Sequence, residues 1–231
     1  MLDLLLMNLT FYGHSCFALA NSSVNILFDP ASSMLGTPDV NPEEFNPDFM
    51  CLSHGHGDHV ADAISIAKRT ECKVISNYEI VTWLGEQGIQ NGMPLNHGGQ
   101  YHFDFGTIKY VNAVHSSVLP DGTYGGNPGG FLINIDGKQI YYAGDTALTW
   151  DMKIIGEQCN LDWAILPIGD VFTMGIDDAI IASEYISCDN IIGMHFDTFP
   201  PIAINKDEAK TKFNSAGKKL TLLNINETLE L

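Results

Sequence analysis

Short apolar runs rich in β-branched and aromatic residues recur along the chain, and each run is bounded by Gly, Asn, Asp or Pro. This pattern is typical of strands separated by turns. It predicts strands over residues 8–12, 16–20, 24–28, 49–53, 73–76, 107–114, 130–135, 138–143, 162–167, 190–194 and 219–223. Asp136 and Gly137 separate two of these runs. They favour a type I′ hairpin turn, because both residues tolerate positive φ angles.

Apolar residues at helical spacing predict helices over residues 60–69, 78–87, 151–158, 177–187 and 206–216. Asp177 or Asp178, and Asn205, stand where the last two helices need N-terminal caps. Strands come first and then alternate with helices, and this order occurs twice along the chain, with the turn-rich residues 116–130 joining the two halves. We therefore expect an α+β fold of four layers, in which two mixed β-sheets lie face to face and helices cover them.

Composition and charge narrow the class of protein. The chain has 231 residues, 45% hydrophobic and 17% charged, which fits one domain over residues 1–231. Its 28 acidic and 11 basic residues give a formal charge of −17, which disfavours generic binding to nucleic acid or anionic membranes. The apolar patch from Leu4 to Met7 lacks a basic flank, so we expect neither a signal peptide nor a membrane span there. Five widely spaced cysteines suit reduced, buried thiols and a cytoplasmic location.

A dense group of side chains that commonly bind metal ions follows the apolar run ending at Leu52. Its members are His54, His56, Asp58 and His59. We expect Gly55 and Gly57, which lie between them, to prevent a regular helix and to let the loop fold tightly around ions. Four donors exceed what one tetrahedral zinc with an open position can use, so the loop predicts two ions rather than one.

Further donors stand just past the ends of three other predicted strands. They are His115, Asp145 and His195. Because ligand sites in sheets gather where strands end and loops begin, we expect them to complete a set of seven ligands. Imidazole and carboxylate without thiolate suit zinc, with manganese or iron as alternatives. His97 and His102 lie in or beside a turn and are predicted not to bind metal, and Cys51, inside a strand, is predicted to be a buried structural thiol.

Residues 53–59, His115, the Ala143–Thr146 turn and His195 together resemble the metallo-β-lactamase superfamily. Local motifs narrow the resemblance to small metal-dependent hydrolases near the ascorbate-phosphate lactonase branch. The motifs are GHSCF at 13–17, FDP at 28–30, HSS at 115–117, AGDT at 143–146, LPIGDVFTMG at 166–175 and MHFDTFP at 194–200. That family commonly has Pro after the fifth motif, where this chain has Ile176 at a predicted helix start.

The resemblance also implies how the ligands are shared. One ion would be bound by His54, His56 and His115. The other would be bound by Asp58, His59 and His195, with Asp145 bridging both.

Two cations that flank one water lower its pKa towards neutrality. We therefore expect an enzyme, a hydrolase that uses a metal-bridging hydroxide on a small ester-, lactone- or phosphoester-like substrate. Asp58 is expected to receive or relay a proton. His14, in the turn between the first two strands, is either a hydrogen-bond donor to the developing oxyanion or a structural residue bonded to a neighbouring loop.

Two other functions stay open at this point. A nuclease of the tRNA-processing branch shares the His-x-His-x-Asp-His and Gly-Asp-Thr features. It needs a basic arm or groove, however, and Lys68-Arg69 and Lys218-Lys219 are the only adjacent basic pairs. The other is a binding protein in which the metals only stabilise the fold. We expect a small-molecule substrate and neither nucleic acid nor membrane as partner, and we leave a homo-oligomer open.

Overall fold

The computed structural model describes residues 6–231, so the N-terminal part of the apolar patch, Leu4 and Leu5, lies outside the described residues. The chain forms two compact units. The first comprises residues 1–96, 117–126 and 223–231, and the second comprises residues 97–116 and 127–222. Each unit contains one seven-stranded mixed sheet, as predicted. The single domain over residues 1–231 stays a prediction. Within residues 6–231, no helix has the length and apolar character needed to cross a membrane.

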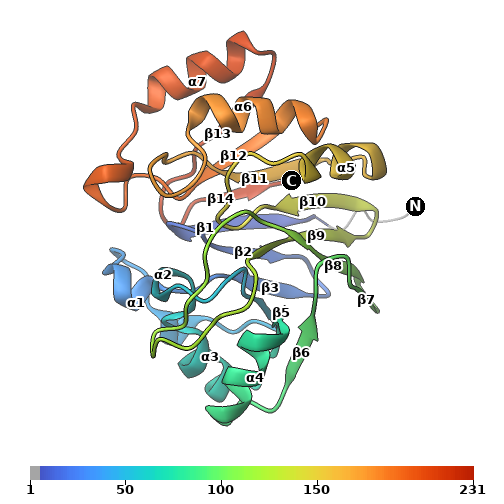
Figure 1. The fold of residues 1–231 in the computed structure, drawn as a ribbon, viewed down its shortest axis with the longest axis vertical. Coiled ribbons are helices and arrows are strands. Elements are labelled where there is room, and N and C mark those ends of the chain that lie inside the picture. Colours follow the sequence, from blue (N-terminus) through green and yellow to red (C-terminus); the bar gives the residue numbers. More distant parts are fainter. Residues whose placement is uncertain (1–5) are drawn as a thin grey trace. The chain divides into compact units, whose positions relative to one another are not determined.

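The sheet of the first unit has the strand order β14-β1-β2-β3-β4-β5-β6 (Figure 1). Its strands are β1 (Asn8–Gly13), β2 (Cys16–Ala20), β3 (Asn25–Phe28), β4 (Phe49–Cys51), β5 (Lys73–Asn77), β6 (Gly92–Leu95) and β14 (Thr228–Glu230). Pairs from β14 to β3 are antiparallel, and pairs from β3 to β6 are parallel. Strands β1, β3, β4 and β5 therefore run in one direction, and their C-terminal ends share one edge of the sheet.

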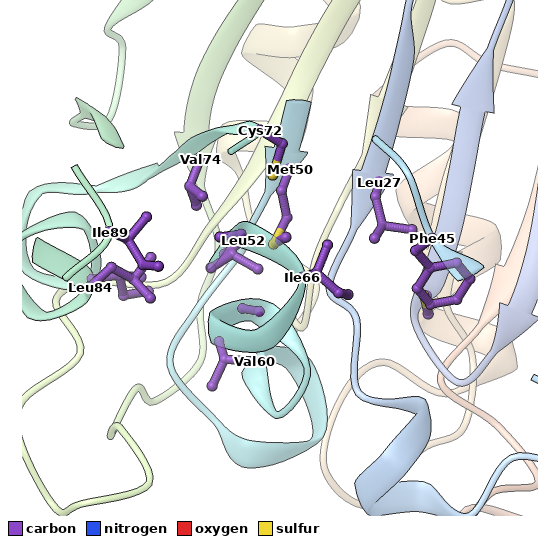
Figure 2. Close-up of a cluster of buried hydrophobic side chains, with 14 of the residues drawn as sticks. Leu27, Phe45, Met50, Leu52, Val60, Ile66, Cys72, Val74, Leu84 and Ile89 are labelled. Atoms are coloured by element: carbon purple, nitrogen blue, oxygen red, sulfur yellow. The ribbon is translucent and has the colours of Figure 1, made fainter. Parts of the chain in front are cut away.

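Helices of the first unit cover one face of this sheet. They are α1 (Ser32–Leu35), α2 (Gly57–Val60), α3 (Ala63–Thr70) and α4 (Tyr78–Glu86), with the 3₁₀ turn η1 (Pro42–Glu44). Ile66 of α3 and Leu84 of α4 pack with the strand residues Met50 and Val74 in one buried apolar cluster (Figure 2). Burial of this cluster away from water fixes the end of β4, from which the loop with His54 and His56 starts.

The sheet of the second unit has the order β13-β12-β11-β10-β9-β8-β7. Its strands are β7 (Gln100–Phe103), β8 (Gly106–Asn112), β9 (Gly129–Ile135), β10 (Lys138–Tyr142), β11 (Trp163–Pro167), β12 (Asn190–Met194) and β13 (Lys219–Thr221). Its helices are α5 (Asp151–Gln158), α6 (Ile176–Tyr185) and α7 (Lys206–Ser215), with the 3₁₀ turn η2 (Pro200–Ile202). Pairs from β13 to β10 are parallel and pairs from β10 to β7 are antiparallel. Strands β8, β10, β11 and β12 therefore end at the same edge.

Local signals for turns and caps have mixed outcomes. The hairpin between β9 and β10 is confirmed, with φ angles of 52° at Asp136 and 86° at Gly137. Asn205 caps α7 as predicted, because its side chain accepts hydrogen bonds from two backbone N–H groups. The cap predicted at Asp177 or Asp178 is wrong, since α6 begins at Ile176 and its N-cap is Gly175. Both acids lie instead in the first turn, where the positive end of the helix dipole favours them.

Three strands that the hydrophobic pattern does not predict are β6, β7 and β14. Each lies at an edge of its sheet. Edge strands are half solvated, as the exposed residues of β7 show, and so they lack the apolar run that marks an inner strand. Pro94 in β6 adds a second reason, because proline within a run argues against an inner strand.

Candidate metal centre

Three strand ends of the first unit bring polar residues to one edge of its sheet. His14 follows β1, Asp29 follows β3, and Ser53 and His54 follow β4. All four residues are buried. Buried polar side chains require partners, and the contacts among these residues supply them.

Asp29 organises this edge. Its Oδ1 accepts a hydrogen bond from the backbone N–H of Ser53 at 2.7 Å, and its Oδ2 accepts one from the Ser53 hydroxyl at 2.5 Å. Nδ1 of His59 lies 2.9 Å from the same Oδ2. A carboxylate only accepts, so Nδ1 of His59 carries the hydrogen and Nε2 carries the lone pair that a metal needs.

His54 is held in the same way by its neighbour. Its Nδ1 lies 3.0 Å from Oγ of Ser53, whose own hydrogen is donated to Asp29. Nδ1 therefore donates, and Nε2 is again the nitrogen with the lone pair. That Nε2 lies 3.0 Å from Nδ1 of His56, so the two ligand candidates converge. Contacts of this kind outside the ligand shell set the tautomer and orientation of metal-binding histidines.

One glycine of the motif acts differently from the prediction. Gly57 does not prevent a helix, because it is the first residue of the one-turn helix α2, which carries Asp58 and His59. Both Gly55 and Gly57 lie close to side chains that would have to shift to admit a Cβ atom. A Cβ atom at 55 would lie 3.2 Å from Cγ of Leu119, and one at 57 would lie 3.0 Å from Sδ of Met34.

His14 makes a contact that fits both of its predicted roles. Its Nε2 lies 3.2 Å from Oδ2 of Asp58, and its side chain is 1% exposed against 22% for Asp58. The same oxygen of Asp58 lies 4.0 Å from Nε2 of His59. His14 thus fixes a carboxylate that keeps partial access to solvent.

The second unit holds a separate cluster. Asp145 follows β10, His195 follows β12 and His115 follows β8, all at the shared edge of that sheet. Oδ2 of Asp145 lies 3.0 Å from Nε2 of His195 and 3.6 Å from Nε2 of His115. Two imidazoles therefore approach one carboxylate oxygen, and the Asp145 and His195 side chains are each only 2% exposed.

Backbone contacts hold these loops together. The Thr146 hydroxyl accepts a hydrogen bond from the N–H of Val114 at 3.0 Å, and Ala147 N–H donates to the Val114 carbonyl at 3.0 Å. These bonds tie the loop of His115 to the loop of Asp145. Gly169, after β11, lies against the backbone of His195, where a Cβ atom would come 2.0 Å from the His195 carbonyl oxygen.

The structure thus distributes the predicted ligands over the two units. His54, His56, Asp58 and His59 gather in the first unit, and His115, Asp145 and His195 gather in the second. Asp29 is the functional residue that sequence reasoning missed, although it follows a predicted strand directly, as the other donors do. The strand-end rule would have found it.

The remaining histidines have other contacts. A ring nitrogen of His97 lies 2.8 Å from the Pro128 carbonyl oxygen, and the ring stacks on Tyr110. His102 is exposed on β7 and lies 3.3 Å from the amide nitrogen of Gln100. That neither binds metal stays a prediction.

The cysteines are free, and all but the half-buried Cys159 are buried, as expected. Burial raises the pKa of the Cys51 thiol well above its ordinary value, and the nearby Asp29 carboxylate raises it further. Cys16 has a raised pKa for the same two reasons. Within residues 6–231, the groups of side chains that lie close enough together to hold a metal ion contain His and Asp and no cysteine. The donor set is therefore imidazole and carboxylate, which fits zinc or another divalent transition metal.

Comparison with known proteins decides the family. Residues 8–195 match the family model described as beta-lactamase superfamily domain. The chain belongs to this superfamily. A relative from Flavobacterium johnsoniae, named UPF0173 metal-dependent hydrolase, is 52% identical over 228 residues, covering 97% of this chain and all of the relative. A relative from Christiangramia forsetii with the same name is 51% identical over 227 residues, with the same coverage.

A solved structure agrees with this assignment to the superfamily. A metallo hydrolase from the archaeon Ignicoccus hospitalis is 35% identical, with a TM-score of 0.88 and coverage of 98% of both chains. The predicted resemblance and the α+β fold class are confirmed. The predicted enzyme class, a metal-dependent hydrolase, is confirmed by the relatives.

Proposed function

We propose that this superfamily member is a binuclear metallohydrolase that acts on a small ester-, lactone- or phosphoester-like substrate. The observation that carries the proposal is the convergence of two imidazoles on one oxygen of Asp145, at 3.0 and 3.6 Å. A carboxylate with two such neighbours suits a bridging ligand, because its oxygens can serve two ions at once.

The ligand assignment follows the family. His54, His56 and His115 would hold one ion. Asp58, His59 and His195 would hold the other, with Asp145 shared by both. Zinc suits this set first, and manganese or iron are alternatives. The tautomers of His54 and His59 support the assignment, because both side chains have Nε2 in the lone-pair form.

Bound divalent cations would supply a bridging hydroxide at neutral pH and would polarise the scissile bond. The chain's own residues then have two tasks. Asp58, partly exposed and fixed by His14, would receive or relay a proton. His14, buried at the same place, would share its Nε2–H between Asp58 and the oxygen on which charge builds.

The substrate is proposed to be a small molecule taken from the cytoplasm. The formal charge of −17 opposes binding of a polynucleotide, and the free cysteines suit a reducing compartment. No part of this proposal needs a nucleic-acid or membrane partner.

The test is a substrate panel on protein purified without chelator. Lactones, carboxylic esters, thioesters, phosphodiesters and β-lactams are assayed with the wild type and with His54→Ala. The proposal expects hydrolysis of at least one carboxylic ester, lactone or phosphodiester, abolished in the variant. Efficient cleavage of a precursor tRNA at physiological salt, with no ester hydrolysis, would contradict it.

A further inference from the structure

The loop between β11 and α6 carries a sequence motif that the metal centre does not use. Asp170 and Val171 both have left-handed backbone conformations, with φ angles of 62° and 57°. This conformation is rare for a β-branched residue such as Val. Local strain of this kind persists only where the surroundings impose it, and it concentrates at functional sites.

The loop is anchored at both ends beside the second cluster. Gly169, at its start, touches the backbone of His195. Near its end, the N–H of buried Met174 donates to the carbonyl of Thr146 at 3.0 Å, one residue after Asp145. Within the loop, Asp170 N–H donates to the Met174 carbonyl at 3.0 Å, and Oδ1 of Asp170 accepts from the N–H of Val171 at 2.7 Å. The strained residues are therefore held in place relative to Asp145 and His195.

The anchored loop displays apolar side chains to solvent. Val171 is 63% exposed and Phe172 is 51% exposed. Two adjacent exposed apolar side chains on an anchored, strained backbone are typical of a surface that binds another molecule.

The charge around the loop limits the class of molecule. Val171 lines an open cavity of about 470 Å³ together with Asp170, Asp177 and Asp178, and the exposed Phe172 is the next residue in the chain, outside that lining. Lys212 also lines it, but its ammonium pairs with Asp177 at 2.9 Å. Carboxylates repel anions, so the surface suits an uncharged molecule rather than a phosphate ester.

We infer that Val171 and Phe172 bind the apolar part of the substrate, and that the substrate class is the neutral carboxylic esters and lactones with an apolar acyl group. This inference rests on the proposed function and narrows it. Phosphoesters, which the proposed function admits, are excluded by it as preferred substrates.

The direct test compares two p-nitrophenyl esters, acetyl and octanoyl, in wild type, Phe172→Ala and the control Tyr101→Ala. Tyr101 is an exposed aromatic residue on the edge strand β7. Because Phe172→Ala removes apolar contact, we expect it to raise KM for the octanoyl ester by roughly tenfold or more. KM for the acetyl ester should rise far less. Tyr101→Ala should change neither KM. If Phe172→Ala changed KM equally for both esters, or left both KM values unchanged, the inference would be overturned.

The left-handed backbone conformation of Val171 gives a second test of the inference. Asn tolerates the left-handed conformation, so Val171→Asn should raise Tm while it raises KM for the octanoyl ester. A higher Tm with an unchanged KM would overturn the assignment of Val171.

A binding measurement separates failure of this inference from failure of the proposed function. In Phe172→Trp, an uncleavable octyl ether analogue should shift the emission of the new tryptophan, measured as the difference from wild type. If the wild type hydrolyses no carboxylic ester, lactone or phosphodiester of the panel but the shift occurs, the proposed function fails and the apolar site stands. If esters are hydrolysed and no shift occurs, the site assignment fails alone. If the emission shifted when the protein concentration was raised in the absence of ligand, a second copy of the chain would cover the loop. That result would also overturn the inference.

Discussion

Oδ2 of Asp29 and Nδ1 of His59 lie 2.9 Å apart, with both side chains fully buried. The same carboxylate holds Ser53, which in turn contacts His54. One acid that is not a predicted ligand therefore orients two residues that are. Such supporting contacts are typical of metal centres and contribute to metal affinity.

Replacing Asp29 with Asn should lower metal affinity by roughly ten- to a hundredfold. The amide keeps one acceptor oxygen, but its NH₂ would face either the backbone N–H of Ser53, or both the Ser53 hydroxyl and Nδ1–H of His59. The measurement is competition with a chromophoric chelator. Asp48→Asn is the control, because this exposed carboxylate also accepts a backbone N–H, from Asn25, but contacts no histidine. Equal affinities in the two variants would refute a supporting role for Asp29.

Replacing Gly169 with Ala should destabilise the protein by about 1–3 kcal/mol and displace His195. The cause is the 2.0 Å approach that a Cβ atom would make to the His195 carbonyl oxygen. Urea unfolding and metal content measure the two effects. Gly85→Ala is the matched control, because its Cβ would meet no atom within 4 Å and Ala favours a helix interior by about 1 kcal/mol. A Gly169→Ala protein as stable as wild type would contradict the packing.

Replacing His14 with Ala should lower kcat roughly ten- to a thousandfold and leave metal content unchanged. Its contact with Asp58 places it beside a predicted ligand, while seven other side chains are available to the ions. Metal content, kcat and KM are measured on one batch, with His102→Ala as a control for an exposed histidine. Loss of a metal ion would show that His14 is a ligand or is needed to hold Asp58 as one, and an unchanged kcat would show that it is structural.

The stability of the fold should fall as pH rises above 9. Burial raises the pKa of Cys188 from its ordinary value of 9.0 to about 11. Between these values the unfolded thiol loses its proton and the folded thiol keeps it, so the folded state binds more protons and loses stability with rising pH. The effect is up to about 1.4 kcal/mol per pH unit for such a thiol.

Urea unfolding of wild type and Cys188→Ala between pH 8 and pH 11 tests this directly. The alanine variant lacks the thiol, so the difference in unfolding free energy between the two proteins should shrink as pH rises. A difference that stays constant over this range would mean that Cys188 titrates normally in the folded protein.

Much of the centre could be predicted from the sequence, because its signals are local. His54, His56, Asp58 and His59 lie within six consecutive positions. Donors directly after apolar runs are easily recognised. The strand directions explain why this rule worked. In each sheet the relevant strands run the same way, so residues distant in sequence reach one edge.

The errors have physical causes that a local pattern does not contain. Asp29 stands at a strand end and in the FDP motif, but its contacts with Ser53 and His59 join residues 24 and 30 positions away, which the sequence does not show. The limited space at Gly57 comes from Met34, a neighbour in space that lies 23 positions away in the sequence. The missed edge strands are defined by hydrogen bonds to an inner neighbour rather than by their own apolar content.

The central claim is that the two clusters together hold two ions. Metal analysis of protein purified without chelator and reconstituted with zinc tests it most directly. We predict about two ions per chain for the wild type, since seven donors exceed what one ion can use. Asp145→Ala should hold less than one, because a bridging ligand serves both ions. Asp189→Ala, which removes an exposed acid paired with Lys218, should still hold about two. A wild-type stoichiometry of one or less would contradict the account.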